Sequence, residues 1–311
     1  MYPEMYALIR KIGRQQCLLI LFKFKKMKKE VFMRIFFSEM KKITERKQFW
    51  IILIFLTAIV FTDFWFTCEN YQETLLSNIP SAFDLIVINS YYDGSIGMFF
   101  FRSFPFILIA SLIGSDVFYS EKERGIHNYI FTRISAKKYI RYQVSAVMMV
   151  TFLTIVFVII ISQCLALMVF PVQGYMIEDK TAYNVLLTTP GYILSGLRAT
   201  NPYLNNIIYA IIWGITGAMF SLFSYALSFI HQMKRYTILM IPMLLYLIYT
   251  IVMTLIAGRI SNLWLSICLE TNLLKVNSAG SAWVYVVIYA VIAGISFMLI
   301  QRGLRNDKEL L

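Results

Sequence analysis

The chain has 311 residues, of which 59% are apolar, 16% are aromatic and only 15% are charged, and its formal net charge is +12. This composition is typical of a bilayer protein and argues against the two soluble domains that a chain of this length could otherwise form. The positive charge indicates membrane topology and attraction to anionic lipid, and it does not indicate binding to a nucleic acid.

Residues 1–30 predict a basic tail without a cleavable signal peptide, because the apolar run CLLILF is short and is followed by KFKKMKKE. Over residues 31–48, apolar side chains recur at helical spacing opposite a charged face, which predicts an amphipathic helix in the membrane interface. The apolar stripe comprises Phe32, Met33, Phe36, Phe37, Met40 and Ile43. A solvated basic leader to the first span is the alternative interpretation.

Six apolar segments in residues 49–311 are long enough, or nearly so, to cross the hydrocarbon as helices. They cover residues 49–66, 97–117, 144–170, 207–230, 236–257 and 282–300. Runs of this length differ from the alternating strands of a membrane barrel, so the predicted fold class is an all-α bundle of six transmembrane helices. Pro105, Pro242, Gly214 and Gly217 permit kinks or close helix approach, and ordinary bundle packing explains them equally well.

Lys and Arg residues are distributed unequally around these segments. Twenty-four of the 29 precede the first span, follow the sixth, or lie in the second-to-third and fourth-to-fifth connections, whereas four lie in the other three connections. Basic residues close to span ends are retained in the cytoplasm. The distribution therefore predicts a multi-pass protein of the cell (plasma) membrane with both termini cytoplasmic.

The connection between the second and third spans is long and patterned. The stretch SDVFYSEKERGIHNYIFTRISAKKYIRYQ, residues 115–143, holds nine charged side chains. After the charged turn at Gly125, the residues Ile126, Tyr129 and Ile130 recur at helical spacing, which predicts a short amphipathic helix. Such a projection offers an apolar anchor with charged flanks to a cytosolic partner, although a loop bound to lipid headgroups would share the pattern.

The order of acidic residues, glycine, apolar helix, arginine and aromatic-basic run in this stretch resembles the permease subunits of type-2 ABC transporters. Their E-x-x-x-G-T turn is present here with Ile126 in place of the threonine. The resemblance implies a coupling helix that docks on a separate ABC ATPase, and a second permease copy or a paralogue as a further partner. It implies ATPase-coupling roles for Glu121, Glu123, Gly125, Ile126, Tyr129, Ile130, Arg133, Lys138 and Tyr139.

The sequence holds no G-x-x-x-x-G-K-[ST] phosphate loop, so we expect the partner ATPase to bind ATP and Mg²⁺ and this chain to carry no cofactor. The histidines His127 and His231 both fall on the predicted cytosolic side, and no H-E-x-x-H or G-x-S-x-G motif is present, which disfavours an enzyme. The four cysteines lack the spacing of a zinc site. Cys68 and Cys268 fall on the same predicted side, where unpaired thiols are favoured over a disulfide.

Three charged residues lie within the predicted spans, where an ionisable group costs about 3 kcal/mol or more. Asp63 and Arg102 lie toward the outer ends of adjacent spans. They can pair with each other, or each can extend to the outer headgroups, and the second interpretation is favoured. Asp116, at the inner end of the second span, is expected to have a structural role.

These features favour the membrane-spanning permease subunit of an ABC exporter, which forms the translocation pathway as a dimer. An ion-coupled secondary transporter and a non-transporting membrane sensor or anchor are the alternatives. The secondary transporter is disfavoured because such proteins usually place ionisable residues near the midplane and have broken helices in repeated halves, and neither feature is evident. The substrate is not readable from the spans.

Overall fold

A computed structural model describes residues 33–75, 79–88, 97, 100–101, 104–123, 125, 130, 132, 134–172, 195–230, 233–257 and 282–306. Within these residues every regular element is an α-helix, which confirms the all-α fold class. The helices are α2 (Lys47–Tyr71), α4 (Phe104–Glu123), α6 (Ala136–Val169), α8 (Ser195–Thr200), α9 (Pro202–Leu227), α10 (Arg235–Ala257) and α12 (Ala282–Asn306).

Four of these helices are long and apolar enough to cross a membrane, namely α2, α6, α9 and the part Val286–Arg305 of α12. α10 contains a shorter apolar helix, Arg235–Tyr249. Each of the six predicted segments overlaps a helix, and four of these helices qualify as spans, so the described residues indicate a multi-pass membrane protein, while the count of six spans stays a prediction. The predicted tail, residues 1–30, lies outside the described residues.

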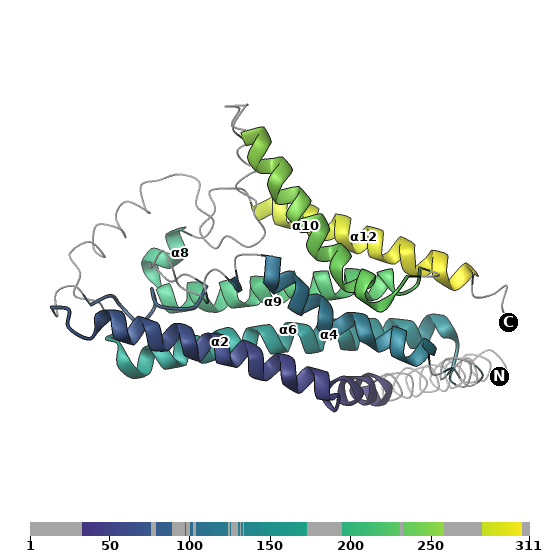
Figure 1. The fold of residues 1–311 in the computed structure, drawn as a ribbon, viewed down its shortest axis with the longest axis horizontal. Helices are drawn as coiled ribbons and strands as arrows, with labels where there is room; N and C mark the ends of the chain where they lie inside the picture. The colour runs from purple at the N-terminus through teal and green to yellow at the C-terminus, as the bar shows by residue number, and fades with distance from the viewer. Residues whose placement is uncertain are drawn as a thin grey trace, which may run out of the picture.

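Helices α2, α4, α6 and α9 lie together in a bundle, and α10 and α12 cover one side of it (Figure 1). α9 contacts α4, α6, α10 and α12, so it forms the centre. Two of its glycines allow this packing: a Cβ at Gly214 would lie 2.6 Å from Val156 of α6, and one at Gly217 would overlap Ile155. Of the alternatives that the sequence left open at Gly214 and Gly217, the structure shows close helix approach.

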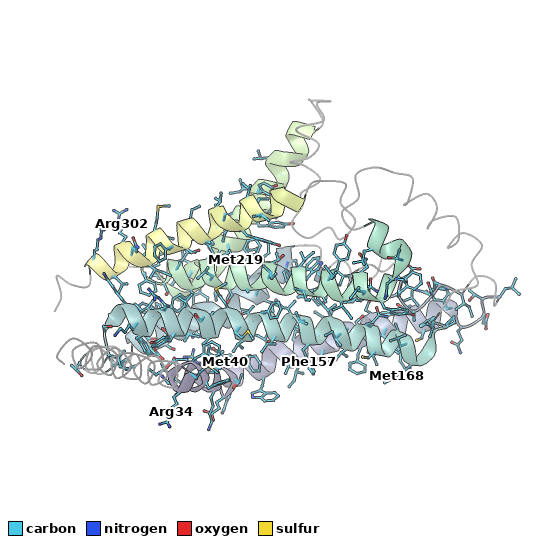
Figure 2. The ribbon with its side chains drawn as sticks, turned by 180° about the vertical axis from the view of Figure 1, so that it is seen from behind. Arg34, Met40, Phe157, Met168, Met219 and Arg302 are labelled. Carbon is cyan, nitrogen blue, oxygen red and sulfur yellow. The ribbon has the colours of Figure 1, made fainter. Side chains whose placement is uncertain are left out.

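The outside of the bundle is apolar. Large apolar side chains are exposed on α2 and α6. Trp65 of α2 is one of them, and Phe157 and Met168 of α6 are labelled in Figure 2. A soluble protein rarely exposes such a continuous apolar surface. The surface fits contact with lipid, in agreement with the lengths of the helices.

The helices on either side of the patterned connection extend beyond the apolar segments that predicted them. α4 continues to Glu123 instead of ending at Val117, and α6 begins at Ala136 instead of Val144. The predicted boundaries followed hydropathy, whereas Glu, Lys and Ala are good helix formers that continue a helix into water. With 34 residues, α6 is about 51 Å long and projects well beyond a hydrocarbon layer of about 30 Å.

Residues 33–44 form a helix that is separated from α2 by a turn at residues 45–46. The side chains of its apolar stripe are of two kinds, buried and exposed. Ile43 is buried in the bundle core with Phe36 and Met40 packed beside it, whereas Met33 and Phe37 are exposed. The predicted helix is therefore present over residues 33–44, and one side of it belongs to the core.

A non-helical segment, residues 79–88, is buried between α2, α6 and α9 at the end of the bundle where α2 ends. Polar side chains satisfy its backbone: Asn206 Nδ2 donates to Phe83 O at 2.8 Å, and Gln163 Nε2 donates to Ala82 O at 2.9 Å. Ser162 Oγ accepts from the Val87 amide at 2.9 Å. Irregular backbone is tolerated at membrane depth only where protein groups bond to it in this way.

Candidate functional site

Two glutamates from separate helices come together inside the bundle around Tyr139. They lie at the end of the bundle where α4 ends, and Figure 1 shows that α2 begins and α12 ends there too. Glu39 belongs to the helix of residues 33–44 and Glu121 to the last turn of α4, and they are 2% and 5% exposed. The hydroxyl of Tyr139 in α6 lies 2.9 Å from Glu121 Oε2 and 3.4 Å from Glu39 Oε1. We define the carboxylate network as Glu39, Lys42, Glu121, Tyr139, Gln143 and Tyr225.

Gln143 of α6 connects the Glu121 carboxylate to α9. Its Nε2 donates to Glu121 Oε2 at 2.8 Å, and its Oε1 accepts a hydrogen bond from the Tyr225 hydroxyl at 2.7 Å. Gln143 and Tyr225 are completely buried. Water cannot replace a lost partner there, so the hydrogen bonds hold α4, α6 and α9 in one arrangement.

Lys42 is the cation of the network, and about 43% of its side chain is exposed. Its ammonium group bonds to Glu39 Oε1 at 2.5 Å and lies 3.8 Å from Glu121 Oε1. It therefore offsets part of the charge of two carboxylates that would otherwise repel each other.

Burial raises the pKa of Glu39 above its ordinary value, and the nearby Glu121 raises it further, while Lys42 and the Tyr139 hydroxyl act in the opposite direction. Glu39 Oε2 accepts no hydrogen bond from the described residues. Tyr139 has a single hydroxyl proton, and the shorter contact assigns it to Glu121. A protonated Glu39 can in turn donate to Tyr139, so the geometry accommodates one extra proton.

Aromatic side chains connect the network to α12. Phe118 of α4 stacks on Phe229 with ring centroids 3.8 Å apart, and Tyr225 meets Phe229 edge to face at 5.5 Å. On α12, a Cβ at Gly303 would lie only 2.6 Å from Phe229 Cβ. α12 therefore packs directly on the aromatic group that surrounds Tyr225. In a close-packed interior, we expect a displacement of the end of α4 to displace α12 through Phe118 and Phe229.

Six of the nine predicted coupling residues are among the described residues, and two of these six, Glu121 and Tyr139, belong to the network. Gly125 follows α4 with φ of +66°, a left-handed conformation that favours glycine, as expected for a residue that ends one helix before another. Ile130 is half-buried, and its carbonyl accepts from the Ile134 amide at 3.0 Å, which is one helical turn. Ile126, Tyr129 and Arg133 lie outside the described residues.

The other four predicted coupling residues divide by exposure. Glu123 and Lys138 are exposed and are free to meet a partner. Glu121 and Tyr139 are buried in the network. The expectation that Glu121 contributes an exposed charge to the rim of a docking surface does not fit this position, because hydrogen bonds from α6 draw its side chain inward.

The charges predicted within the spans have different surroundings. Asp63 is buried in α2, and its Oδ1 accepts a hydrogen bond from the Gly97 amide at 3.0 Å, so it does not extend to headgroups. A Cβ at Gly97 would lie 2.8 Å from the Asp63 carboxyl carbon, so this close approach requires glycine. Arg102 lies outside the described residues, and Asp116 is helical but its side chain is not described. Cys68 is half-buried, and Cys268 lies outside the described residues.

Sequence reasoning missed four members of the network: Glu39, Lys42, Gln143 and Tyr225. A signal was available for one of them. Tyr139 and Gln143 are four residues apart and share a helix face that leads into an apolar segment, where an amide needs a protein partner. Lys42 is only three residues from Glu39, but the contact of Glu39 with Tyr139 and that of Gln143 with Tyr225 span 100 and 82 residues along the chain, and no local pattern reports such pairings.

The network can hold hydrogen bonds and a proton between helices, but it offers neither a thiol nor a histidine for nucleophilic or metal chemistry. Among the residues that the structure describes, no group of three or more His, Cys, Asp or Glu side chains could hold a metal ion. Comparisons with protein-family models, curated proteins and solved structures found no match to this chain.

Proposed function

We propose that the chain is a membrane-spanning permease subunit of a type-2 ABC exporter. Two copies, or one copy and a paralogue, form the pathway, and a separate ATPase binds ATP and Mg²⁺. In this proposal the chain lies in the plasma membrane with both termini in the cytoplasm, the helix of residues 33–44 borders the membrane interface, and anionic lipid faces the basic end. The proposal starts from the resemblance of residues 115–143 to the family.

The carboxylate network is the observation that supports the proposal best. It fixes the end of α4, four residues before the Gly125 turn, to α6, α9 and the N-terminal helix. If the ATPase displaces the connection after Gly125, the displacement reaches Glu121, which is only four residues away at the end of α4. A connection that only joins two helices would not need buried hydrogen bonds to three other elements.

The proposal is tested by truncating the expected anchor of the coupling helix. Tyr129→Ala should weaken co-purification of the ATPase, since loss of a buried aromatic anchor commonly costs about 2 kcal/mol or more. Tyr236→Ala is the matched control, because Tyr236 is 80% exposed at the start of α10. Equal recovery of the ATPase with both variants would contradict the docking role.

Glu123→Lys tests the electrostatic part of docking separately. Glu123 is exposed, so reversing its charge should leave membrane abundance unchanged and should lower the rate of ATPase association most at low salt. Glu121 is unsuitable for this purpose, because a buried lysine at its position would damage the network.

Proton-coupled transport is a second candidate function, and the Glu39–Glu121 pair favours it. A buried carboxyl with a raised pKa beside a second carboxylate is a usual proton-binding arrangement. The purified chain in vesicles with an imposed pH gradient discriminates the two functions. Uptake or release of protons by the chain alone, abolished by Glu39→Gln, would favour the proton-coupled transporter, whereas a chain without proton flux supports the permease subunit.

A further inference from the structure

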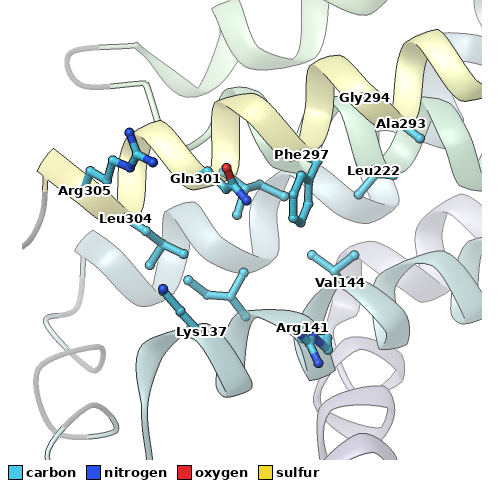
Figure 3. Close-up of a pocket in the computed structure, with 12 residues that line it drawn as sticks. Lys137, Arg141, Val144, Leu222, Ala293, Gly294, Phe297, Gln301, Leu304 and Arg305 are labelled. Carbon is cyan, nitrogen blue, oxygen red and sulfur yellow. The ribbon is translucent and has the colours of Figure 1, made fainter.

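A cavity of about 840 Å³ opens between the beginning of α6 and the end of α12, with α9 as its floor. Figure 3 shows Lys137 of α6 and Phe297 of α12 extending into the space between the two helices. The cavity lies beside the carboxylate network but shares no side chain with it. None of the functions proposed above uses it.

One end of the cavity is basic. Lys137 and Arg141 come from the first two turns of α6, and Arg305 comes from the last turn of α12. Among the described residues no acidic side chain lines the cavity, and the ion pairs are made by other lysines, Lys41 and Lys42. Three basic residues therefore line this end of the cavity without a described counter-charge, which is the complement of an anionic group.

The other end of the cavity is apolar. Val144 and the buried Leu222 line its inner part. Phe297 lies opposite them, on a helix long enough to span a membrane, and is 62% exposed. From Phe297 to Arg305 the lining follows one side of α12 for about 12 Å. An exposed aromatic side chain beside an apolar floor can pack against a hydrocarbon chain, whereas inorganic phosphate or a nucleotide would leave this half unfilled.

The order of the two ends matches the depth profile of a lipid. Because α6 is longer than the hydrocarbon is thick, its first residues lie at headgroup level while Val144 and the residues after it enter the apolar layer. A phospholipid in the same leaflet has its charge and its acyl chains in that same order. Basic pockets between transmembrane helices bind anionic headgroups by this arrangement.

We propose that this cavity is a binding site for one anionic phospholipid of the surrounding bilayer. Its phosphate is held by Lys137, Arg141 and Arg305, and an acyl chain packs along Leu222 and Phe297. The bound lipid joins α6 to α12, the two helices that also flank the carboxylate network and its aromatic group. The proposal does not depend on the transport function.

The experiment uses the full chain in nanodiscs that contain equal amounts of phosphatidylglycerol and phosphatidylcholine with identical acyl chains. Native mass spectrometry then measures which lipid stays bound to the chain after the chain is released from the nanodisc. The triple variant Lys137→Gln, Arg141→Gln, Arg305→Gln should lose the preference for phosphatidylglycerol by about tenfold or more. The matched control Lys47→Gln, Lys234→Gln, Arg302→Gln removes three exposed positive charges outside the cavity and should change the preference by less than about twofold.

Phe297→Ala tests the apolar half, and it should reduce retention of both lipids because it removes contact with the acyl chain. Equal loss of preference in the triple variant and its control would mean general attraction of basic residues to the surface, and would overturn the site. Displacement of the retained lipid by millimolar inorganic phosphate would show a phosphate site instead. A change of oligomeric mass in the triple variant without loss of lipid would identify the cavity as an interface between copies.

Discussion

Replacing Gln143 with leucine should destabilise the protein strongly, because this amide serves two buried neighbours. The change removes the acceptor of the Tyr225 hydroxyl and one of the two donors to Glu121 Oε2. Each buried group left without a partner costs about 1–3 kcal/mol, so we expect Gln143→Leu to lower the free energy of unfolding by about 2–5 kcal/mol. Tyr225→Phe leaves only the Gln143 amide oxygen without its hydrogen-bond donor and should lower the free energy of unfolding by about 1–3 kcal/mol.

The double variant shows whether the two side chains interact. With both changes the stranded Tyr225 hydroxyl is gone, so the combined loss should be smaller than the sum of the single losses by about 1–2 kcal/mol. The assay is reversible unfolding in mixed detergent micelles. Ser145→Ala is the control in the same helix, because Ser145 is only half-buried and its hydroxyl bonds to Arg141 O within α6, and it should change stability by less than about 0.5 kcal/mol. Strictly additive losses would refute the network.

Four further variants can be measured by the same unfolding assay. Gly125→Ala should cost about 1–2 kcal/mol because of its left-handed φ, whereas Gly294→Ala, in a helix with open space around it, should stabilise by up to about 1 kcal/mol; equal effects would argue against the turn. Asn206→Leu should cost about 1–3 kcal/mol, since it removes the donor to the carbonyl of the buried segment at residues 79–88, and an unchanged stability would contradict that role. Because the folded pKa of Glu39 is raised, the folded state binds more protons than the unfolded state, and stability should fall as pH rises from about 4.5 through the raised pKa. Glu39→Gln should remove this pH-dependent loss of stability. Parallel curves of stability against pH for the wild-type protein and the variant would contradict the role of Glu39.

Hydropathy and glycine positions predicted much of the fold. Runs of apolar residues located all six long helices, since a bilayer demands backbone hydrogen bonds within each segment. The break between two helices at Gly125 follows from the lack of a Cβ, a local property, whereas the sequence does not decide between a kink and close helix approach at Gly214 and Gly217. The fold class was therefore readable from short stretches of sequence.

The candidate site was only partly predictable, because it depends on pairings between distant parts of the chain. Glu121 was found as an acidic residue before a glycine turn, but its inward orientation depends on Tyr139 and Gln143. Glu39 lies on a helix whose charged face predicted contact with headgroups, and its neighbours are supplied by α4 and α6. Residues 79–88 lie in a predicted connection and are non-helical, but their burial depends on side chains of α6 and α9 that are 75 to 123 residues away along the chain.

Affinity purification of the tagged full chain from its native membranes, followed by identification of the proteins bound to it, tests the proposed function most directly. The permease proposal predicts a stoichiometric partner that contains a G-x-x-x-x-G-K-[ST] phosphate loop, with ATP hydrolysis by the complex that Tyr129→Ala reduces and Tyr236→Ala does not. Recovery of the chain without any such subunit, with transport driven by a proton gradient alone, would contradict it.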